Sequence, residues 1–349
     1  MNKIANFAAR RSLYIAILAV IGIVIALVLS RLPADNSKNY NLTVAGASPG
    51  GLWSALGLGL DKAVNKSNSD FTITYQTSSG GLANAKLVSD NKVPLGIASD
   101  IELQSAWEGT GVFKDRPLKN LRVLFRLFTA ESRFQSIHLL LNRDFADKHG
   151  IETFADIVAN KIEIRVAVNR PGNMDGDLGI AILAALGAPI DEIRNWGGQV
   201  FRAATREQTN LMTDRRLDLI NFGLSYNHAS VRELANAVPL IMVDLTEPVA
   251  AKVASGMGGK PCAFKKDEYE FLDHDVTTIC TGAVLIANQE MDEELAYMLT
   301  KAMLENLESF KSAHQQLAQV TTLHSVAEDS VAPRHPGAER ALREAGMIE

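Results

Sequence analysis

The sequence contains little cysteine and no concentration of positive charge. Its 349 residues include two cysteines and seven histidines, and no Cys/His cluster has the spacing of metal ligands. Lysine and arginine total 35 against 40 aspartate and glutamate residues, so the net charge is −5, and no basic block occurs. We therefore expect no metal site and no nucleic-acid partner.

Cofactor motifs are also missing from the first glycine-rich turn, residues 46–51. Its glycines stand at 46, 50 and 51, which does not fit G-x-G-x-x-G, and no lysine follows Gly51 as a phosphate loop requires. We expect no cofactor. The same turn does fit G-x-S-x-G, the nucleophile elbow, with Ser48 as the nucleophile. Pro49 follows that serine and has no N–H for an oxyanion hole, so a serine hydrolase is the weaker reading.

The N-terminus carries an apolar segment. Lys3, Arg10 and Arg11 precede an uncharged apolar run over residues 13–29. Residues 1–30 are therefore expected to be a signal peptide or an N-terminal membrane anchor, and both readings remain open. Because the positive charge precedes the run, either reading places the chain after residue 31 outside the cytoplasm. We expect a periplasmic protein, secreted or tethered to the inner membrane, with a linker over 31–40.

The two cysteines are Cys262 and Cys280. In an oxidising compartment such a pair is typical of a disulfide, although two unconnected small core residues remain the alternative.

Strands and helices alternate along the rest of the chain, which indicates an α/β fold. Four turns between a strand and a helix are rich in Gly, Ser, Thr or Asn: residues 46–51, 77–81, 169–177 and 223–227. Helix caps favour such residues in any case, but ligands of α/β sheets bind at the carboxyl ends of the strands. We expect the turns to converge on one cleft, where helix N-termini aim their N–H groups at one carboxylate.

With these motifs the chain resembles the TAXI family, the solute-binding receptors of TRAP transporters, over about residues 40–346. The motifs are Gly50-Gly51, Thr77-x-Ser79-Gly80-Gly81-x-x-Asn84, Ser99-Asp100 followed by Ala106-x-Glu108-Gly109, Pro171-Gly172, and His335-Pro336-Gly337-Ala338. The resemblance implies a type II periplasmic-binding-protein fold, two α/β lobes with a hinge and a central ligand cleft. It also implies a non-enzymatic receptor that delivers a small carboxylate to a TRAP-type membrane permease.

The sequence departs from the family after Pro171-Gly172. Where the family tends to show Gly-Ser-Gly-Thr, this chain has Asn173-Met174-Asp175-Gly176-Asp177. Either the ligand carries a positive group as well, or the aspartates cap the following helix. The ligands that the resemblance implies are glutamate- or glutamine-like amino acids or dicarboxylates.

The expected site has no catalytic or metal-binding residues. The expected ligand-binding residues come from the four turns and their surroundings: Ser48, Gly50, Gly51, Trp53, Thr77, Ser78, Ser79, Gly80, Asn84, Asp100, Arg133, Arg170, Pro171, Gly172, Asn173, Asp175, Ser225 and Tyr226. Arg133 and Arg170 are the candidates for a bidentate contact with a carboxylate. An alternative function is a membrane-tethered sensor, which would present its closed form to a signalling partner.

The order of elements predicts two lobes, the first from residues 41–134 and 245–349 and the second from residues 135–244. Residues 255–275 show no regular pattern.

Overall fold

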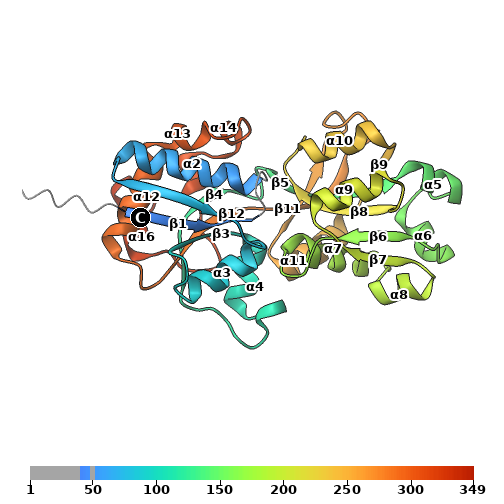
Figure 1. Ribbon diagram of the computed structural model, residues 1–349, viewed down its shortest axis with the longest axis horizontal. Coiled ribbons are helices and arrows are strands. Elements are labelled where there is room, and N and C mark those ends of the chain that lie inside the picture. Colours follow the sequence, from blue (N-terminus) through green and yellow to red (C-terminus); the bar gives the residue numbers. More distant parts are fainter. Residues whose placement is uncertain (1–39, 48–51) are drawn as a thin grey trace, which may run out of the picture. The chain divides into compact units, whose positions relative to one another are not determined.

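The structure is a computed structural model that describes residues 40–47 and 52–349 (Figure 1). The expected signal peptide or anchor, the linker up to residue 39, and the turn residues Ser48, Gly50 and Gly51 lie outside the described residues. Within the described ranges, no helix has the length and apolar character needed to cross a membrane.

The first sheet has five strands in the order β2-β1-β3-β12-β4. Their bounds are β1 (Tyr40–Ala45), β2 (Phe71–Gln76), β3 (Leu95–Ser99), β4 (Leu121–Phe128) and β12 (Ala283–Asn288). The three strands β1, β2 and β3 are parallel, whereas β12 runs antiparallel to both β3 and β4. Strands β3 and β12 are buried along their whole length, because helices cover both faces of the sheet.

The covering helices of this sheet are α2 (Leu52–Ser67), α3 (Gly81–Ser89), α4 (Asp100–Glu108), α12 (Glu293–Glu305), α13 (Leu307–Lys311), α14 (Leu317–Val320), α15 (Leu323–Val326) and α16 (Pro336–Glu344). Successive β12 side chains point to opposite faces. Leu285 packs with Leu56 of α2, and Val284 packs in a separate cluster with Val88 of α3. Accordingly, α2 and α3 lie on opposite sides of the sheet in Figure 1.

The second sheet has seven strands, in the order β10-β11-β5-β8-β6-β7 with β9 also paired to β5. Their bounds are β5 (Gln135–Asn142), β6 (Arg165–Val168), β7 (Gln199–Arg202), β8 (Leu219–Leu224), β9 (Leu240–Met242), β10 (Lys260–Phe264) and β11 (Val276–Thr281). The helices of this part are α5 (Arg143–His149), α6 (Phe154–Asn160), α7 (Met174–Ala185), α8 (Ile190–Asn195), α9 (Thr205–Thr213), α10 (Ala229–Ala237) and α11 (Glu247–Met257). Leu139 and Leu140 of β5 point into different core clusters, so this sheet is also covered on both faces.

The chain passes between the sheets twice, through residues 129–134 and at Gly282. The Gly282 N–H donates to Asp100 Oδ2 at 3.0 Å, and a Cβ on residue 282 would lie 2.5 Å from that oxygen. Asp100 is also 2.7 Å from Arg126 Nη1, in an ion pair whose side chains are 19% and 7% exposed. Asp100, expected at the ligand, therefore fixes one of the two crossings.

Residues 245–281 associate differently from the lobe division expected from the sequence. That division assigns them to the first lobe, whereas β11 pairs with β5, and β10 with β11, in the second sheet. The sequence pattern did not predict the antiparallel pairing that places residues 245–281 in the second sheet. The two-lobe division remains our proposal, and grouping by sheets would move residues 245–281 into the second lobe.

A disulfide joins Cys262 of β10 to Cys280 of β11. It closes a loop of 18 residues in sequence separation, which stabilises the folded state by about 3 kcal/mol through restriction of the unfolded chain. The bond holds β10 at the edge of the second sheet.

His138 of β5 is a fully buried histidine with a fixed hydrogen-bond pattern. Its Nε2 lies 2.7 Å from Tyr269 Oη and its Nδ1 lies 3.1 Å from the Ser136 carbonyl oxygen. Nδ1 must donate to that carbonyl, so Nε2 accepts from the tyrosine, whose oxygen in turn accepts from the Asn227 N–H. Burial lowers the pKa of His138 to about 3, and the ring is neutral.

The buried ring predicts a loss of stability in mild acid. The unfolded chain protonates His138 near pH 6.5, whereas the folded chain does so only near pH 3, so the unfolded state binds more protons between these values. The contribution of the neutral His138 ring to the free energy of unfolding is fully present above pH 6.5. It falls by about 2 kcal/mol between pH 6.5 and 5. We expect His138→Gln to remove that part of the pH dependence in urea unfolding. The exposed His324→Gln variant serves as control, and an unchanged slope in His138→Gln would contradict the prediction.

Candidate functional site

One cavity of about 290 Å³ receives residues from strand ends of both sheets, and we call it the cleft cavity. Each of the four turns contributes to its wall: Ala47 from the first, Gly80 from the second, Asn173 and Asp175 from the third, and Gly223 from the fourth. These residues follow β1, β2 and β6 or lie near the end of β8, so the wall lies at the carboxyl ends of the strands, where α/β folds bind ligands.

The first turn reaches the cavity through Ala47, and the helix that follows it, α2, reaches it through Trp53. The Ala47 N–H donates to Tyr75 Oη at 2.6 Å, and the Tyr75 ring fits against Gly46, where a Cβ would approach it to 2.1 Å. Trp53 is 7% exposed and packs in the core of the first sheet. Its Nε1 lies 3.4 Å from Oε1 of Gln135, and both residues line the cavity.

Most of the second turn holds the fold together and does not line the cavity. The fully buried Asn84 donates through Nδ2 to the carbonyl oxygens of Gly46 and Ile97, both at 2.7 Å, which ties the ends of β1 and β3. The Ser78 hydroxyl lies 2.7 Å from the Gly46 oxygen. Thr77 and Ser79 are exposed. From this turn only Gly80 lines the cavity, with a φ of 131° that favours glycine.

Glu102 of α4 places a carboxylate at the beginning of three helices. Its Oε1 accepts from the Gly81 N–H at 2.9 Å, and its Oε2 accepts from the Ser99 N–H at 3.0 Å and the Ser99 hydroxyl at 2.9 Å. The carboxylate also accepts from the Met174 N–H, at the start of α7. Burial raises the pKa of Glu102, and these hydrogen bonds oppose that shift. Glu102 thus places its own carboxylate at the N–H groups of helix N-termini, where the sequence analysis expected the carboxylate of the ligand.

Asp175, in the first turn of α7, is a buried carboxyl in the cavity wall. It accepts from the Gly223 N–H and from the Asn169 side chain, and a Cβ on residue 223 would lie 1.9 Å from Asp175 Oδ1. Burial, aided by the nearby negative charge of Glu102, raises the pKa of Asp175 to about 7. Among the described residues, none forms an ion pair with Asp175, so its charge has no counterion there.

Arg206, at the start of α9, supplies a positive charge to the same wall. Its exposed guanidinium makes no hydrogen bond or ion pair with any described residue. Ala204 precedes α9 and provides no side-chain cap, so the first N–H groups of the helix also lack a side-chain acceptor. Arg206 and this helix end form the positive part of the cleft cavity.

His228, also in the wall, is a neutral donor. Its Nδ1 accepts from the Ser230 N–H at 3.2 Å, which leaves the proton on Nε2. Burial, with smaller effects of the positive charges of Arg232 and His314, lowers the pKa of His228.

Several residues expected in the site have partners elsewhere. Arg133 lies 2.8 Å from Glu268 and Arg170 lies 3.3 Å from Glu207, both in ion pairs away from the cavity wall. The backbone oxygen of Tyr226 accepts from Gln316 at 2.7 Å, and its ring lies against Tyr269. The remaining expected residues outside the wall are Pro171, Gly172 and the buried Ser225.

The structure thus brings together four of the expected residues, Trp53, Gly80, Asn173 and Asp175. The sequence analysis missed other polar wall residues: Glu102, Gln135, Asn169, Thr205, Arg206, His228 and Ser230. One signal was available, because Ser99-x-x-Glu102 has the spacing of a capping box, which the structure contains.

Several solved structures share this architecture. The periplasmic binding protein BugD superimposes with a TM-score of 0.53 at 14% identity, over 88% of this chain and 93% of that chain. MatC from Rhodopseudomonas palustris with bound malate gives 0.51 at 16% identity, over 80% and 88%. PhnD1 from Prochlorococcus marinus in complex with methylphosphonate gives 0.50 at 12% identity, over 89% and 100%. At these identities the similarity concerns the fold alone, and it confirms the expected α/β fold of the type found in the periplasmic binding protein BugD.

The family follows from the sequence match. The model of the NMT1-like family matches residues 44–346, so the chain belongs to the NMT1-like family. The narrower resemblance to the TAXI receptors goes beyond this match and enters the proposal below.

Proposed function

We propose that the protein is an extracytoplasmic solute-binding protein of the TAXI type, which captures a small organic acid in the cleft cavity. The observation that carries the proposal is the free positive end of that cavity. Arg206 and the uncapped start of α9 offer hydrogen-bond donors and positive charge at the carboxyl ends of the strands, without a partner among the described residues. A carboxylate would receive a charge-assisted hydrogen bond there.

Asp175 favours one of the two ligand classes that the sequence left open. A dicarboxylate would bring more negative charge beside a buried carboxyl that already feels Glu102. A glutamate- or glutamine-like amino acid would bring an ammonium group, which can pair with Asp175 while its carboxylate faces Arg206. We propose an amino acid as the ligand.

Binding without catalysis is supported by the fold that the chain shares with the periplasmic binding protein BugD. A ligand in the cleft cavity would contact residues of both sheets, which are joined by two crossings within the described part of the chain. It would therefore stabilise the closed arrangement by differential affinity, and a TRAP-type membrane permease would recognise that form. Residues 13–29 would direct the protein to the periplasm or tether it to the inner membrane.

Paired arginine variants test the binding site. A thermal-shift panel of amino acids and dicarboxylates first identifies a solute that raises the melting temperature. We expect Arg206→Ala to lower the affinity for that solute by 10- to 100-fold in calorimetry, because a charge-assisted hydrogen bond contributes about 1.5–3 kcal/mol. Arg170→Ala should leave the affinity unchanged, because Arg170 pairs with Glu207 outside the wall. Equal affinities in wild type and Arg206→Ala would contradict the proposed site.

A further inference from the structure

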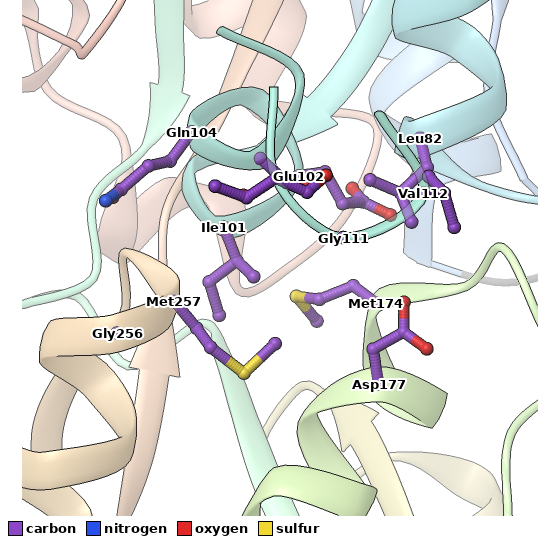
Figure 2. A pocket seen from close by; sticks show the side chains of 12 residues that line it. Leu82, Ile101, Glu102, Gln104, Gly111, Val112, Met174, Asp177, Gly256 and Met257 are labelled. Carbon is purple, nitrogen blue, oxygen red and sulfur yellow. The ribbon is translucent and has the colours of Figure 1, made fainter. Parts of the chain in front are cut away.

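A second cavity, of about 330 Å³, adjoins the cleft cavity (Figure 2). The two cavities share Glu102 and Met174, which form the wall between them. The second cavity, like the first, is lined by residues from both parts of the fold: α3 and α4 from the first sheet's helices, and α7 and α11 from the second sheet's helices.

The second cavity has mainly apolar walls. Figure 2 shows Ile101, Met174 and Met257 directed toward one common space, with Leu82 and Val112 along one side. Val112 is 53% exposed, an unusual exposure for a large apolar side chain. These walls suit an aliphatic chain, which would gain free energy by leaving water.

Asp177 is a carboxyl in the wall of this second cavity. Figure 2 shows it beside Met174, and burial raises its pKa. Its side chain forms no hydrogen bond or ion pair with any described residue. The charge of Arg202 opposes the pKa shift, but the Arg202 guanidinium donates to the Asn169 carbonyl oxygen and forms no ion pair with Asp177. A basic group on a ligand would provide the missing counterion.

The two residues of the shared wall differ in their freedom to move. Hydrogen bonds from the starts of three helices hold the Glu102 carboxylate in place. Met174 has a flexible, unbranched side chain whose sulfur receives one weak contact, from Ser99 Oγ at 3.3 Å. Rotation of Met174 would connect the cavities without breaking the Glu102 network.

Together the two cavities present three carboxyls, Glu102, Asp175 and Asp177, against one free guanidinium, Arg206. Glu102 already accepts four hydrogen bonds, so Asp175 and Asp177 are the carboxyls open to a ligand. Charge complementarity therefore requires two positive groups and one negative group.

We propose that the second cavity holds the ligand's side chain, and that the ligand is an α-amino acid whose long aliphatic side chain ends in a basic group. This inference rests on the proposed function, because the α-ammonium and α-carboxylate would occupy the cleft cavity. The proposed ligand differs from glutamate in the charge of its side chain, which is positive and would pair with Asp177.

Calorimetric titration with lysine, norleucine and glutamate tests the inference. Lysine and norleucine have side chains of similar length that differ in the terminal ammonium, so their ratio isolates the basic group. We expect lysine to bind at least tenfold more tightly than norleucine, and norleucine more tightly than glutamate. Asp177→Asn should reduce the lysine-to-norleucine ratio to about 1 while norleucine binds as before, and Asp191→Asn, at a 90% exposed side chain, should change neither.

A second variant tests the cavity itself. Met257→Trp would fill the apolar space of the second cavity. We expect it to lower the affinities for lysine and norleucine by the same factor and to leave the affinity for alanine unchanged. Binding of glutamate or glutamine in preference to lysine would overturn the inference and leave the proposed function standing. A lysine preference that Asp177→Asn does not change would also overturn it. If no amino acid or dicarboxylate binds, both the inference and the proposed function fail.

Discussion

Glu102→Gln is expected to lower the free energy of unfolding by about 3 kcal/mol. The carboxylate accepts from the N–H groups of Gly81, Ser99 and Met174 and from the Ser99 hydroxyl. A glutamine offers one acceptor oxygen, and its NH₂ group would face backbone N–H donors that have no other acceptor. Because Met174 begins α7, a helix that packs with the second sheet, the substitution also weakens a contact between the parts of the chain that carry the two sheets.

Urea unfolding with Glu108→Gln as the matched control measures this effect. Glu108 lies on the same helix, α4, but its side chain is exposed, so its variant should unfold within about 0.5 kcal/mol of wild type. Similar unfolding free energies for the two variants would show that the buried carboxylate does not hold the three helix ends.

Asp175→Asn is expected to weaken amino-acid binding at least tenfold at pH 8 and to remove its pH dependence. The pKa of Asp175 is raised to about 7, so its carboxyl is mostly protonated at pH 6 and mostly ionised at pH 8. An ammonium group binds the ionised form, and the apparent affinity scales with the ionised fraction. Wild-type affinity should therefore rise by about tenfold from pH 6 to pH 8.

The ligand provides the control for this prediction. Glutarate has the two carboxylates of glutamate and no ammonium, so its affinity should not rise over the same pH range. Calorimetry at pH 6, 7 and 8 makes the comparison. A pH profile for the amino acid that is the same in wild type and Asp175→Asn would exclude Asp175 as the partner of the ammonium group.

The α/β class and the position of Asp175 could be predicted from local patterns. Alternating strands and helices indicated the α/β layers. The third turn placed Asp175 between β6 and the next helix, and the structure has it in the first turn of α7 and in the cavity wall. The conformation of a turn depends on the types of adjacent residues, so one sequence is enough to predict where a turn occurs.

The arginine of the wall could not be predicted in this way. Arg133 and Arg170 stand near the turns in sequence, yet each pairs with a glutamate more than 30 residues away. Arg206 looks like a solvated residue at a helix start, and it reaches the cavity because β7 pairs with β6 at the edge of the second sheet. Such pairings between distant residues are tertiary and leave no periodic signal.

Strand β10 escaped the sequence analysis for a related reason. Its residues alternate poorly, and Pro261 is unfavourable within a strand away from an edge. The pairing with β11 and the disulfide between Cys262 and Cys280 hold it at the sheet edge. The spacing of the two cysteines alone left that bond open.

A crystal structure of the protein with the solute that gives the largest thermal shift tests the central claim most directly. We predict electron density for one small acid in the cleft cavity, with its carboxylate within hydrogen-bond distance of Arg206 and its ammonium group beside Asp175. Density for the solute outside this cavity, or a carboxylate that contacts neither Arg206 nor the start of α9, would contradict the account.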